Sequence, residues 1–334
     1  MTEQRTSKLA HRLAIATAVS AVLLLLFGGT VTGIGAGMAV DGWWIVDRGK
    51  GDHFLLFYPV GDWLHSTGKF YEHVHRLIGA LVGLLAIGTL IAAWRGIGRR
   101  GAIIASAIAL LAIILQGAIG GFRVLENSPE LAFLHGAFGQ LTFGVIIAVA
   151  AVLSPRWATA ERRPCKLAGS LQRRSLFAAV IVYATIVMGA MLRHGMRHDG
   201  RSPLGATEAL IIHVTLVLFA VIALIALVRS LRATAAQGAA DGHDRGSLSA
   251  LAKRILWLGA LQLLLGIGSF MVVFNGPTVE YVHNSVIPTL HVLFGALLLS
   301  QCMTSVLWSR RLVSRVAGVT TERAPAAASI GGAA

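Results

Sequence analysis

The chain has 334 residues, of which 55% are hydrophobic and only 13% are charged. A typical soluble domain carries roughly a quarter charged residues, so this composition excludes a soluble enzyme and indicates an integral membrane protein. The net charge of +14 would suit a nucleic-acid-binding protein only if the basic residues gathered on one folded surface. Most of them lie instead in short segments between apolar runs, and we therefore expect no nucleic-acid partner.

Eight apolar runs of about bilayer-spanning length follow one another along the chain. They cover residues 13–40, 77–94, 101–121, 131–153, 175–192, 209–228, 255–274 and 286–308. The second span is expected to begin near Phe70, because the preceding FYEHVHR is strongly helical. The sequence thus predicts an all-α integral membrane protein with eight transmembrane helices. Residues 229–254 are expected to form a hydrophilic, mobile inner loop.

The Lys and Arg residues are distributed unevenly between the two sides of these spans. If the N-terminus is inside, most of the 29 Lys and Arg residues fall in inner segments. The positive-inside rule therefore predicts that both the N- and C-termini are cytoplasmic. The first apolar run is too long for a cleaved signal peptide, and the tail before it does not resemble a mitochondrial transit peptide. We expect a multi-pass protein of a bacterial cell membrane.

Three short motifs occur twice, in the same order, in the two halves of the chain. GMxxDG occurs at 37–42 and 195–200, Gln-x3-Gly at Gln116 and Gln262, and HxxFGxL at His135 and His291. The repetition predicts two four-helix bundles, residues 1–153 and 175–308, joined by a linker at 154–174 and followed by a mobile tail at 309–334. Because four is even, the two bundles have the same orientation and are parallel repeats.

Four histidines lie in the even-numbered spans, each a few residues inside the outer end of its helix: His75, His135, His213 and His291. A single membrane histidine is usually a packed, hydrogen-bonded residue, but four at one depth, two in each repeat, are hard to explain by packing. Two neutral imidazoles from facing helices can ligate one haem iron from opposite sides. The pattern therefore predicts two bis-histidine haem sites with these four residues as iron ligands.

A non-haem metal centre is the alternative to haem. Such a centre would normally add carboxylate or cysteine ligands, and only Glu72 and Glu208 lie near the histidines. Three of the histidines have a glycine four residues later, at Gly79, Gly139 and Gly295. These glycines would let a flat macrocycle approach the helix, or they serve close helix packing.

Glu72 lies three residues before His75 and so on nearly the same face of the predicted helix. A carboxylate at this depth is costly unless it is paired or functional, so Glu72 is a candidate functional residue. An ion pair with Arg76, four residues further along, is the alternative. The outer helix ends also supply three arginines that can bind haem propionates or remain solvated: Arg123, Arg193 and Arg197.

These residues resemble a known family, the haem A synthases of the CtaA/Cox15 type. The resemblance rests on Glu72-His-Val-His75-Arg76 followed by LIGALVGL, on LHGAFGQL around His135, on LIIHVT around His213 and on PTLHVLFGALL around His291. It extends over all eight spans. It implies an oxidoreductase of haem biosynthesis that converts a methyl group of haem O to a formyl group through a hydroxymethyl intermediate, and so supplies terminal oxidases.

The resemblance also implies roles for the residues of the N-terminal half. This half would bind the substrate haem at His75 and His135, with Arg76 and Arg123 beside it and Glu72 in the catalytic role. Family members that carry a cysteine pair in the first outer loop differ from this chain, because residues 37–70 contain no cysteine.

The C-terminal half would hold a haem b cofactor, with its iron between His213 and His291 and with Arg193 and Arg197 as further cofactor-binding residues. The expected partners are haem O, haem O synthase, the assembly of cytochrome oxidase, an electron acceptor that the sequence does not identify, and the lipid bilayer.

Two other functions fit parts of the pattern. A two-haem membrane cytochrome that relays electrons needs the same four histidines and modifies neither haem, but Glu72 beside only one pair favours the enzyme. A transporter built on parallel repeats would have broken helices near the bilayer midplane, and Pro288 is the only proline inside a predicted span.

Overall fold

The computed structural model describes residues 2–49, 51–96, 98–195, 205–237, 242–275 and 282–315. In these ranges, eight helices are long and apolar enough to cross a membrane, which confirms the predicted number of spans. They are α1 (Thr2–Gly33), α3 (Thr67–Gly96), α4 (Arg100–Glu126), α5 (Pro129–Val152), α7 (Ala168–Gly195), α8 (Ala206–Ala236), α9 (Gly242–Asn275) and α10 (Val282–Leu312).

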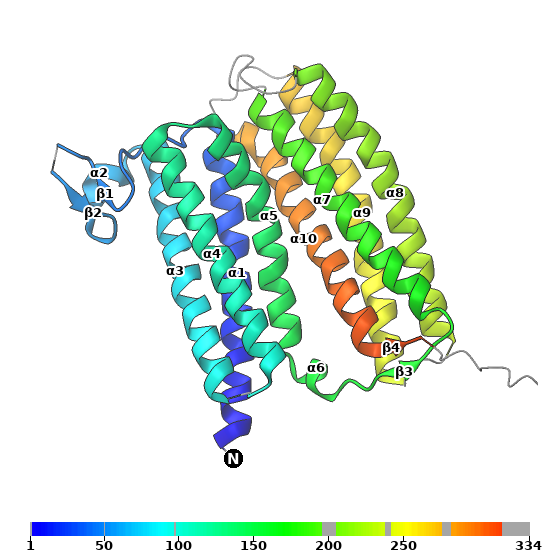
Figure 1. Cartoon of the computed structure of the whole chain (residues 1–334). Helices are drawn as coiled ribbons and strands as arrows, with labels where there is room; N and C mark the ends of the chain where they lie inside the picture. Colours follow the sequence, from blue (N-terminus) through cyan, green and yellow to red (C-terminus); the bar gives the residue numbers. More distant parts are fainter. Residues whose placement is uncertain are drawn as a thin grey trace, which may run out of the picture.

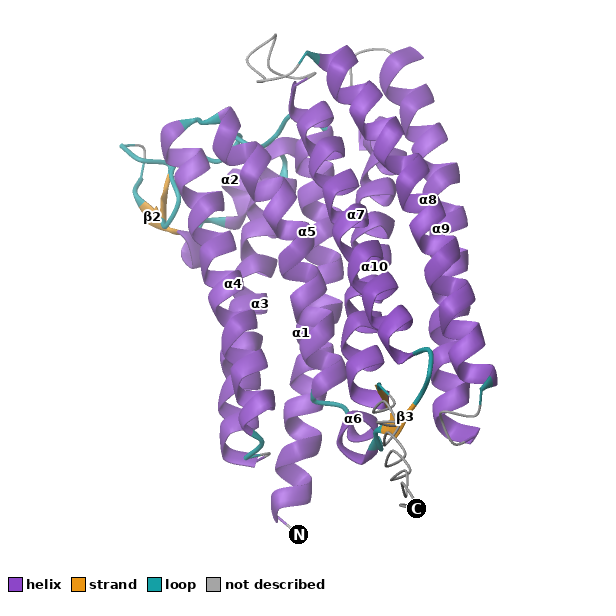
Figure 2. Cartoon of the chain, turned by 45° about the vertical axis from the view of Figure 1, so that its right-hand side comes forward, coloured by secondary structure: helices purple, strands orange, loops and turns teal. Residues whose placement is uncertain are grey.

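The helices form two groups of four (Figure 1). Helices α1, α3, α4 and α5 lie beside one another, as do α7, α8, α9 and α10. Helix α10 of the second group packs against both α1 and α5 of the first. The N-terminus and the short helix α6 (Pro155–Thr159) lie at the same end of the molecule in both views (Figures 1 and 2).

Helix α1 ends earlier than predicted, at Gly33 rather than near residue 40. Gly35 adopts a left-handed backbone conformation with a φ of 69°, and the amide of Ala36 donates to the carbonyl of Val31 over 2.9 Å. This is the usual way in which a glycine terminates a helix, since it has no Cβ to oppose the positive φ. The apolar composition that continues to Val40 concealed this signal.

The prediction of a long hydrophilic loop at 229–254 is wrong. Helix α8 continues to Ala236 and α9 begins at Gly242. The alanines, leucines and arginines of this segment are strong helix formers, so the two helices extend beyond the apolar runs. In the same way, the last third of the predicted linker, from Ala168, is already the first part of α7.

Short elements occupy the two ends of the bundle. At one end, the cap between α1 and α3 contains an antiparallel pair, β1 (Ile45–Val46) and β2 (His53–Phe54), then the 3-10 helix η1 (Leu55–Phe57) and α2 (Val60–Leu64). Its small core comprises Val40, Val46, Leu55 and Tyr58. At the other end, β3 (Arg163–Pro164) pairs in parallel with β4 (Val313–Ser314).

Small residues bring the two helix groups into close contact. A Cβ added at Gly29 of α1 would lie 2.6 Å from Cγ2 of Thr289 on α10, so only a glycine allows this approach. Gly144 of α5 leaves similar room for the side chain of Met303 on α10. Close packing of this kind drives helix association where lipid removes the hydrophobic driving force.

Candidate functional site

Two of the four predicted histidines face each other inside the first helix group. The rings of His75 on α3 and His135 on α5 have centroids 6.4 Å apart and planes inclined at 80°. Two metal–imidazole bonds of about 2 Å on opposite sides of one ion would separate the ring centroids by roughly 6 Å. The pair therefore fits a single metal ion ligated from both sides.

The alternative to haem, a non-haem metal centre, would need more ligands than two histidines. Within the part of the chain that the structure describes, no group of three or more His, Cys, Asp or Glu residues is arranged to hold a metal ion. The donor set at this place is thus a pair of imidazoles, as bis-histidine haem ligation requires.

Three of the four histidines direct Nδ1 toward a main-chain carbonyl of the preceding long helix. The distances are 3.1 Å from His75 to Leu24 O, 3.2 Å from His135 to Gln116 O and 3.0 Å from His213 to Thr185 O. When Nδ1–H donates to a carbonyl, the proton is fixed there and Nε2 keeps its lone pair for a metal.

All four histidine rings also lie against a glycine of the preceding long helix, and for His75, His135 and His213 this glycine comes four residues after the carbonyl. A Cβ added at this glycine would lie 2.7–3.1 Å from Cε1 of the ring, closer than ordinary packing allows. Side chains on a helix tilt toward its N-terminus, so a side chain here would cover the carbonyl that the imidazole needs. The four glycine–histidine pairs are Gly28 with His75, Gly120 with His135, Gly189 with His213, and Gly266 with His291.

His291 departs from this arrangement in one respect. Its Nδ1 is buried and has no hydrogen-bond partner among the described residues. Its Nε2 lies 3.5 Å from the side-chain Nε2 of Gln262. His213 and His291 nevertheless lie close enough to interact electrostatically, so the second group also brings its two histidines together.

Two of the three glycines that follow the histidines take part in close packing, and the predicted approach of a macrocycle stays a prediction. A Cβ added at Gly139 would lie 2.9 Å from the side-chain nitrogen of Gln116, and one at Gly295 would lie 3.1 Å from that of Gln262. These two glycines make room for a neighbouring glutamine, which is the close-packing alternative. Gly79 has only Leu24 within reach, at 3.8 Å.

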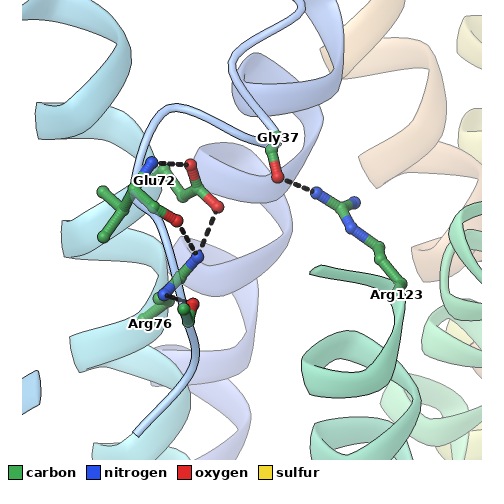
Figure 3. Close-up of polar contacts among 6 residues, drawn as sticks. Gly37, Glu72, Arg76 and Arg123 are labelled. Atoms are coloured by element: carbon green, nitrogen blue, oxygen red, sulfur yellow. Dashed lines mark hydrogen bonds and ion pairs between the residues drawn. The ribbon is translucent and has the colours of Figure 1, made fainter. Parts of the chain in front are cut away.

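Glu72 is buried, with a side chain that is 3% exposed, and it holds the chain that follows α1 (Figure 3). Its Oε2 accepts from the amide of Val40 over 2.8 Å. Its Oε1 accepts from Nη2 of Arg76 over 2.7 Å, so the ion pair considered as the alternative is present. Arg76 also donates to the carbonyls of Val40 and Gly42.

Arg123 reaches the same segment from α4. Its Nη2 donates to the carbonyl of Gly37 over 2.7 Å (Figure 3). Both Arg76 and Arg123 lie close enough to His75 to interact with it electrostatically. Glu72, Arg76 and Arg123 therefore form one polar cluster at the cap end of the first histidine pair.

The C-terminal arginines are placed differently from each other. Arg193 on α7 donates from Nη2 to the carbonyl of Gly29 on α1 over 3.0 Å, across the boundary between the helix groups. It also lies close enough to His291 to interact electrostatically. Arg197 and most of the second GMxxDG motif lie outside the described residues.

The cap contains a second polar group, centred on Tyr58. Its hydroxyl donates to Asp47 over 2.6 Å and accepts from Lys69 over 3.0 Å. Burial, followed by the hydrogen bond to Asp47, raises the pKa of Tyr58 above its ordinary value of 10.0. His73 packs edge-on against Tyr58, with ring centroids 5.2 Å apart, and so supports the cap rather than the histidine pair.

Comparison of the sequence with protein families identifies one match. The family model described as "Cytochrome oxidase assembly protein", COX15-CtaA, matches residues 65–197. This segment is therefore similar to the COX15-CtaA family. The predicted resemblance is confirmed. The COX15-CtaA match includes Glu72, His75, Arg76, Arg123 and His135, whereas His213 and His291 lie beyond it.

Curated relatives carry the name heme A synthase. The protein of Symbiobacterium thermophilum is 29% identical over 191 residues, which are 54% of this chain and 58% of that protein. The protein of Shouchella clausii is 27% identical over 190 residues, 55% of this chain and 58% of its own. The protein of Geobacillus kaustophilus is 24% identical over 186 residues, 54% of this chain and 55% of its own. The alignments thus span somewhat more than half of each relative.

Sequence reasoning identified the four histidines and the Glu72 cluster but missed the surfaces against which the histidine rings lie. Gly28 and Gly189 were not recognised, although Gly120 and Gly266 belong to the repeated Gln-x3-Gly motif. The first, third, fifth and seventh spans each contain such a glycine at a corresponding position. This recurrence is the sequence signal that would have found them.

Proposed function

We propose that this multi-pass membrane protein is a haem A synthase, an oxidoreductase that converts a methyl group of haem O to a formyl group through a hydroxymethyl intermediate. The single observation that carries the proposal is an asymmetry. Among the described residues, a buried carboxylate, Glu72, lies three residues before a histidine of the first pair, whereas Glu208, near the second pair, is exposed. Leu210 occupies the position three residues before His213. The match of residues 65–197 to the COX15-CtaA family supports the same conclusion.

In this proposal, His75 and His135 ligate the iron of haem O, and Glu72 acts at the edge of the substrate that is oxidised. An ionised carboxylate has about four lone-pair positions, and here one hydrogen bond engages each oxygen. Each oxygen therefore keeps a lone pair with which to accept or position a proton. Arg76 holds the carboxylate in place. Arg123 uses only Nη2 in a hydrogen bond among the described residues, so its Nη1 and Nε can bind a haem propionate.

In the second half, His213 and His291 are the proposed ligands of a haem b cofactor. Gly189 and Gly266 fit this use, because they leave the ring positions that two axial imidazoles need. A bound haem b would supply one-electron redox chemistry. The residues of the chain orient the ligands: Thr185 accepts from His213 and fixes its tautomer, and we assign Arg193 and Arg197 to the haem propionates.

We further propose that the two groups are parallel repeats, with both termini on the cytoplasmic side of a bacterial cell membrane. The glycine that lies against each histidine ring recurs in all four long helices that precede the histidine helices, which supports an ancestral four-helix unit. Haem O synthase, as the source of haem O, and cytochrome oxidase assembly, as the use of the product, are the proposed partners.

One observation favours a second function, a two-haem cytochrome that relays electrons. Both oxygens of Glu72 already bind the chain itself, at Val40 and Arg76. If the carboxylate serves only to hold this loop, it takes no part in a reaction. The protein would then bind two haems and modify neither of them.

Haem analysis separates the two functions. Cells that produce haem O would be grown with and without this protein, and their haems extracted and identified by mass. The synthase predicts haem A, or its hydroxymethyl precursor, only in cells with the protein. Haem b and unmodified haem O alone, in a purified protein with bis-histidine spectra, would establish the relay instead.

A further inference from the structure

The four histidine helices pack against their neighbours through one repeated arrangement of four positions. The first position is a residue of the preceding long helix, whose carbonyl meets the imidazole in three of the four copies. The others are the glycine four residues later, the histidine, and the residue four after the histidine. Comparison of the four copies shows where they differ. The first position is Leu24, Gln116, Thr185 and Gln262 in turn, and the fourth is Gly79, Gly139, Val217 and Gly295.

The second copy holds its histidine at two points. The carbonyl of Gln116 accepts from Nδ1 of His135, and the side-chain amide of Gln116 donates to the main-chain carbonyl of His135 over 2.8 Å. Gly139 provides the space for this amide, which also lies 3.0 Å from Nδ1 of the ring. One residue thus fixes both the backbone and the ring of His135.

The first copy holds its histidine at a single point. Nδ1 of His75 meets the carbonyl of Leu24, and the place of the amide is taken by an apolar side chain with no hydrogen-bonding group. In the second half the same residue types recur, since Gln262 and Gly295 accompany His291 whereas Thr185 and Val217 accompany His213. The contacts differ, however, because the side-chain amide of Gln262 lies 3.5 Å from Nε2 of His291, and Nδ1 of His291 has no hydrogen-bond partner among the described residues. Both glutamines also have a buried side-chain oxygen without a partner among the described residues.

We propose that Gln116 is a positioning residue that makes His135 the anchored ligand of the first histidine pair. His75 is then the ligand that exchanges more readily. This inference deepens the proposed function and rests on it. It assigns the entry and release of the substrate haem to the His75 side, where Glu72 lies three residues away.

A substrate haem must bind and leave in every cycle, so one firmly held ligand and one exchangeable ligand suit the first site. Hydrogen-bonding partners of metal-ligating histidines commonly change metal affinity by roughly 10-fold to 100-fold when they are removed. We therefore expect the amide of Gln116 to affect haem retention and ligand exchange without contacting the haem edge that reacts.

The test uses the full-length protein purified from cells that produce haem O. In Gln116→Met the side chain keeps its length and its main-chain carbonyl but loses the amide. In Gly139→Ala the amide remains but is displaced by the new Cβ. The control is Gln172→Met, which removes a glutamine that donates to Ser309 O and Val313 O at the opposite end of the bundle.

Two rates are measured: transfer of haem O to excess apomyoglobin, followed by mass, and binding of carbon monoxide to the reduced protein. We expect both rates to rise roughly 10-fold in Gln116→Met and Gly139→Ala, while Gln172→Met matches the wild type. We also expect His75→Ala to retain haem O and His135→Ala to lose it. Thermal unfolding of each variant shows that the compared proteins are folded.

Unchanged rates in both Gln116→Met and Gly139→Ala, or better retention in His135→Ala than in His75→Ala, would overturn the inference and leave the synthase intact. A wild-type protein that retains neither haem would overturn the proposed function itself.

Discussion

The ring of His75 lies directly against Gly28, so closely that a Cβ on Gly28 would come within 2.7 Å of Cε1. The same relation between Gly189 and His213, at 2.9 Å, belongs to the other helix group. In each proposed haem site, the position of one histidine therefore depends on a glycine that belongs to no recognised chemical motif.

Replacement of Gly28 by Ala should displace His75 and weaken haem binding in the first group alone. The helix itself should tolerate the change, because Ala is a better helix former than Gly. We expect at least roughly 10-fold faster loss of haem O, by analogy with other changes around metal-ligating histidines. Gly189→Ala should affect haem b instead. The haem content of purified protein, resolved by mass, measures both.

Gly83→Ala is the matched control, since Gly83 also lies in a membrane helix and has nothing within 4 Å of the added Cβ. Equal haem loss in Gly28→Ala and Gly83→Ala would show that contact with the ring is not the cause.

The Glu72 carboxylate should stabilise the chain segment after α1. Glu72→Ala removes the acceptor of the Val40 amide and a partner of Arg76. Hydrogen bonds to charged groups contribute about 1.5–3 kcal/mol, so exchange of the Val40 amide hydrogen should accelerate by roughly one to two orders of magnitude. Hydrogen exchange followed by mass spectrometry or NMR gives this rate.

Glu161→Ala should leave the Val40 amide unchanged, because Glu161 forms an exposed pair with Arg163 in the linker. If Val40 exchanged at the wild-type rate in Glu72→Ala, the carboxylate would have no role in holding this segment.

The cap should lose stability in alkaline solution. Burial and the hydrogen bond to Asp47 raise the pKa of Tyr58 above 10.0. The folded cap therefore binds this proton more tightly than the unfolded chain does. The resulting stabilisation is complete below pH 10 and is lost as the pH rises through the raised pKa. Absorbance of tyrosinate during a pH titration, compared between wild type and Tyr58→Phe, isolates this group.

The titration of Tyr58→Phe should lack one tyrosine that ionises in the wild type. We expect the pKa of that tyrosine to lie above the ordinary value of 10.0. A tyrosine with an unshifted titration at this position would contradict the hydrogen bonds assigned to Tyr58.

The proposed topology places the cap outside and the linker inside the cell. Asp62 of the cap and Arg162 of the linker are both exposed, and the native Cys165 and Cys302 are both buried. A membrane-impermeant maleimide added to intact spheroplasts should therefore label Asp62→Cys and spare Arg162→Cys until the membrane is opened. The reverse labelling pattern would place both termini outside.

The sequence was sufficient to predict the eight spans, because their apolar composition is a constraint that the bilayer imposes on every residue. Helix geometry also predicted that the four histidines lie at similar depth, and in the structure each ring lies against a glycine of the preceding long helix. Sequence reasoning failed at the end of α1 and at 229–254, where a single positive φ at Gly35 and local helix propensity decide the structure.

The partners of the histidines were beyond reach for a different reason. Gly28 meets His75 and Gly189 meets His213 only because particular helices become neighbours, and hydropathy does not determine which helices those are. The double role of Gln116 likewise depends on the space left by Gly139 on another helix. The repeated Gln-x3-Gly motif contains Gln116 and Gly120, but only the fold shows that both residues contact His135.

The most direct test of the account compares two acidic residues near two similar histidine pairs. Glu72 is buried three residues before His75, whereas Glu208 is exposed five residues before His213. Each would be changed to Ala in the full-length protein in cells that produce haem O, and the extracted haems identified by mass. We predict that Glu208→Ala still yields haem A and that Glu72→Ala yields only haem O or the hydroxymethyl form. Wild-type amounts of haem A from Glu72→Ala would contradict the central claim that this carboxylate distinguishes the reacting site.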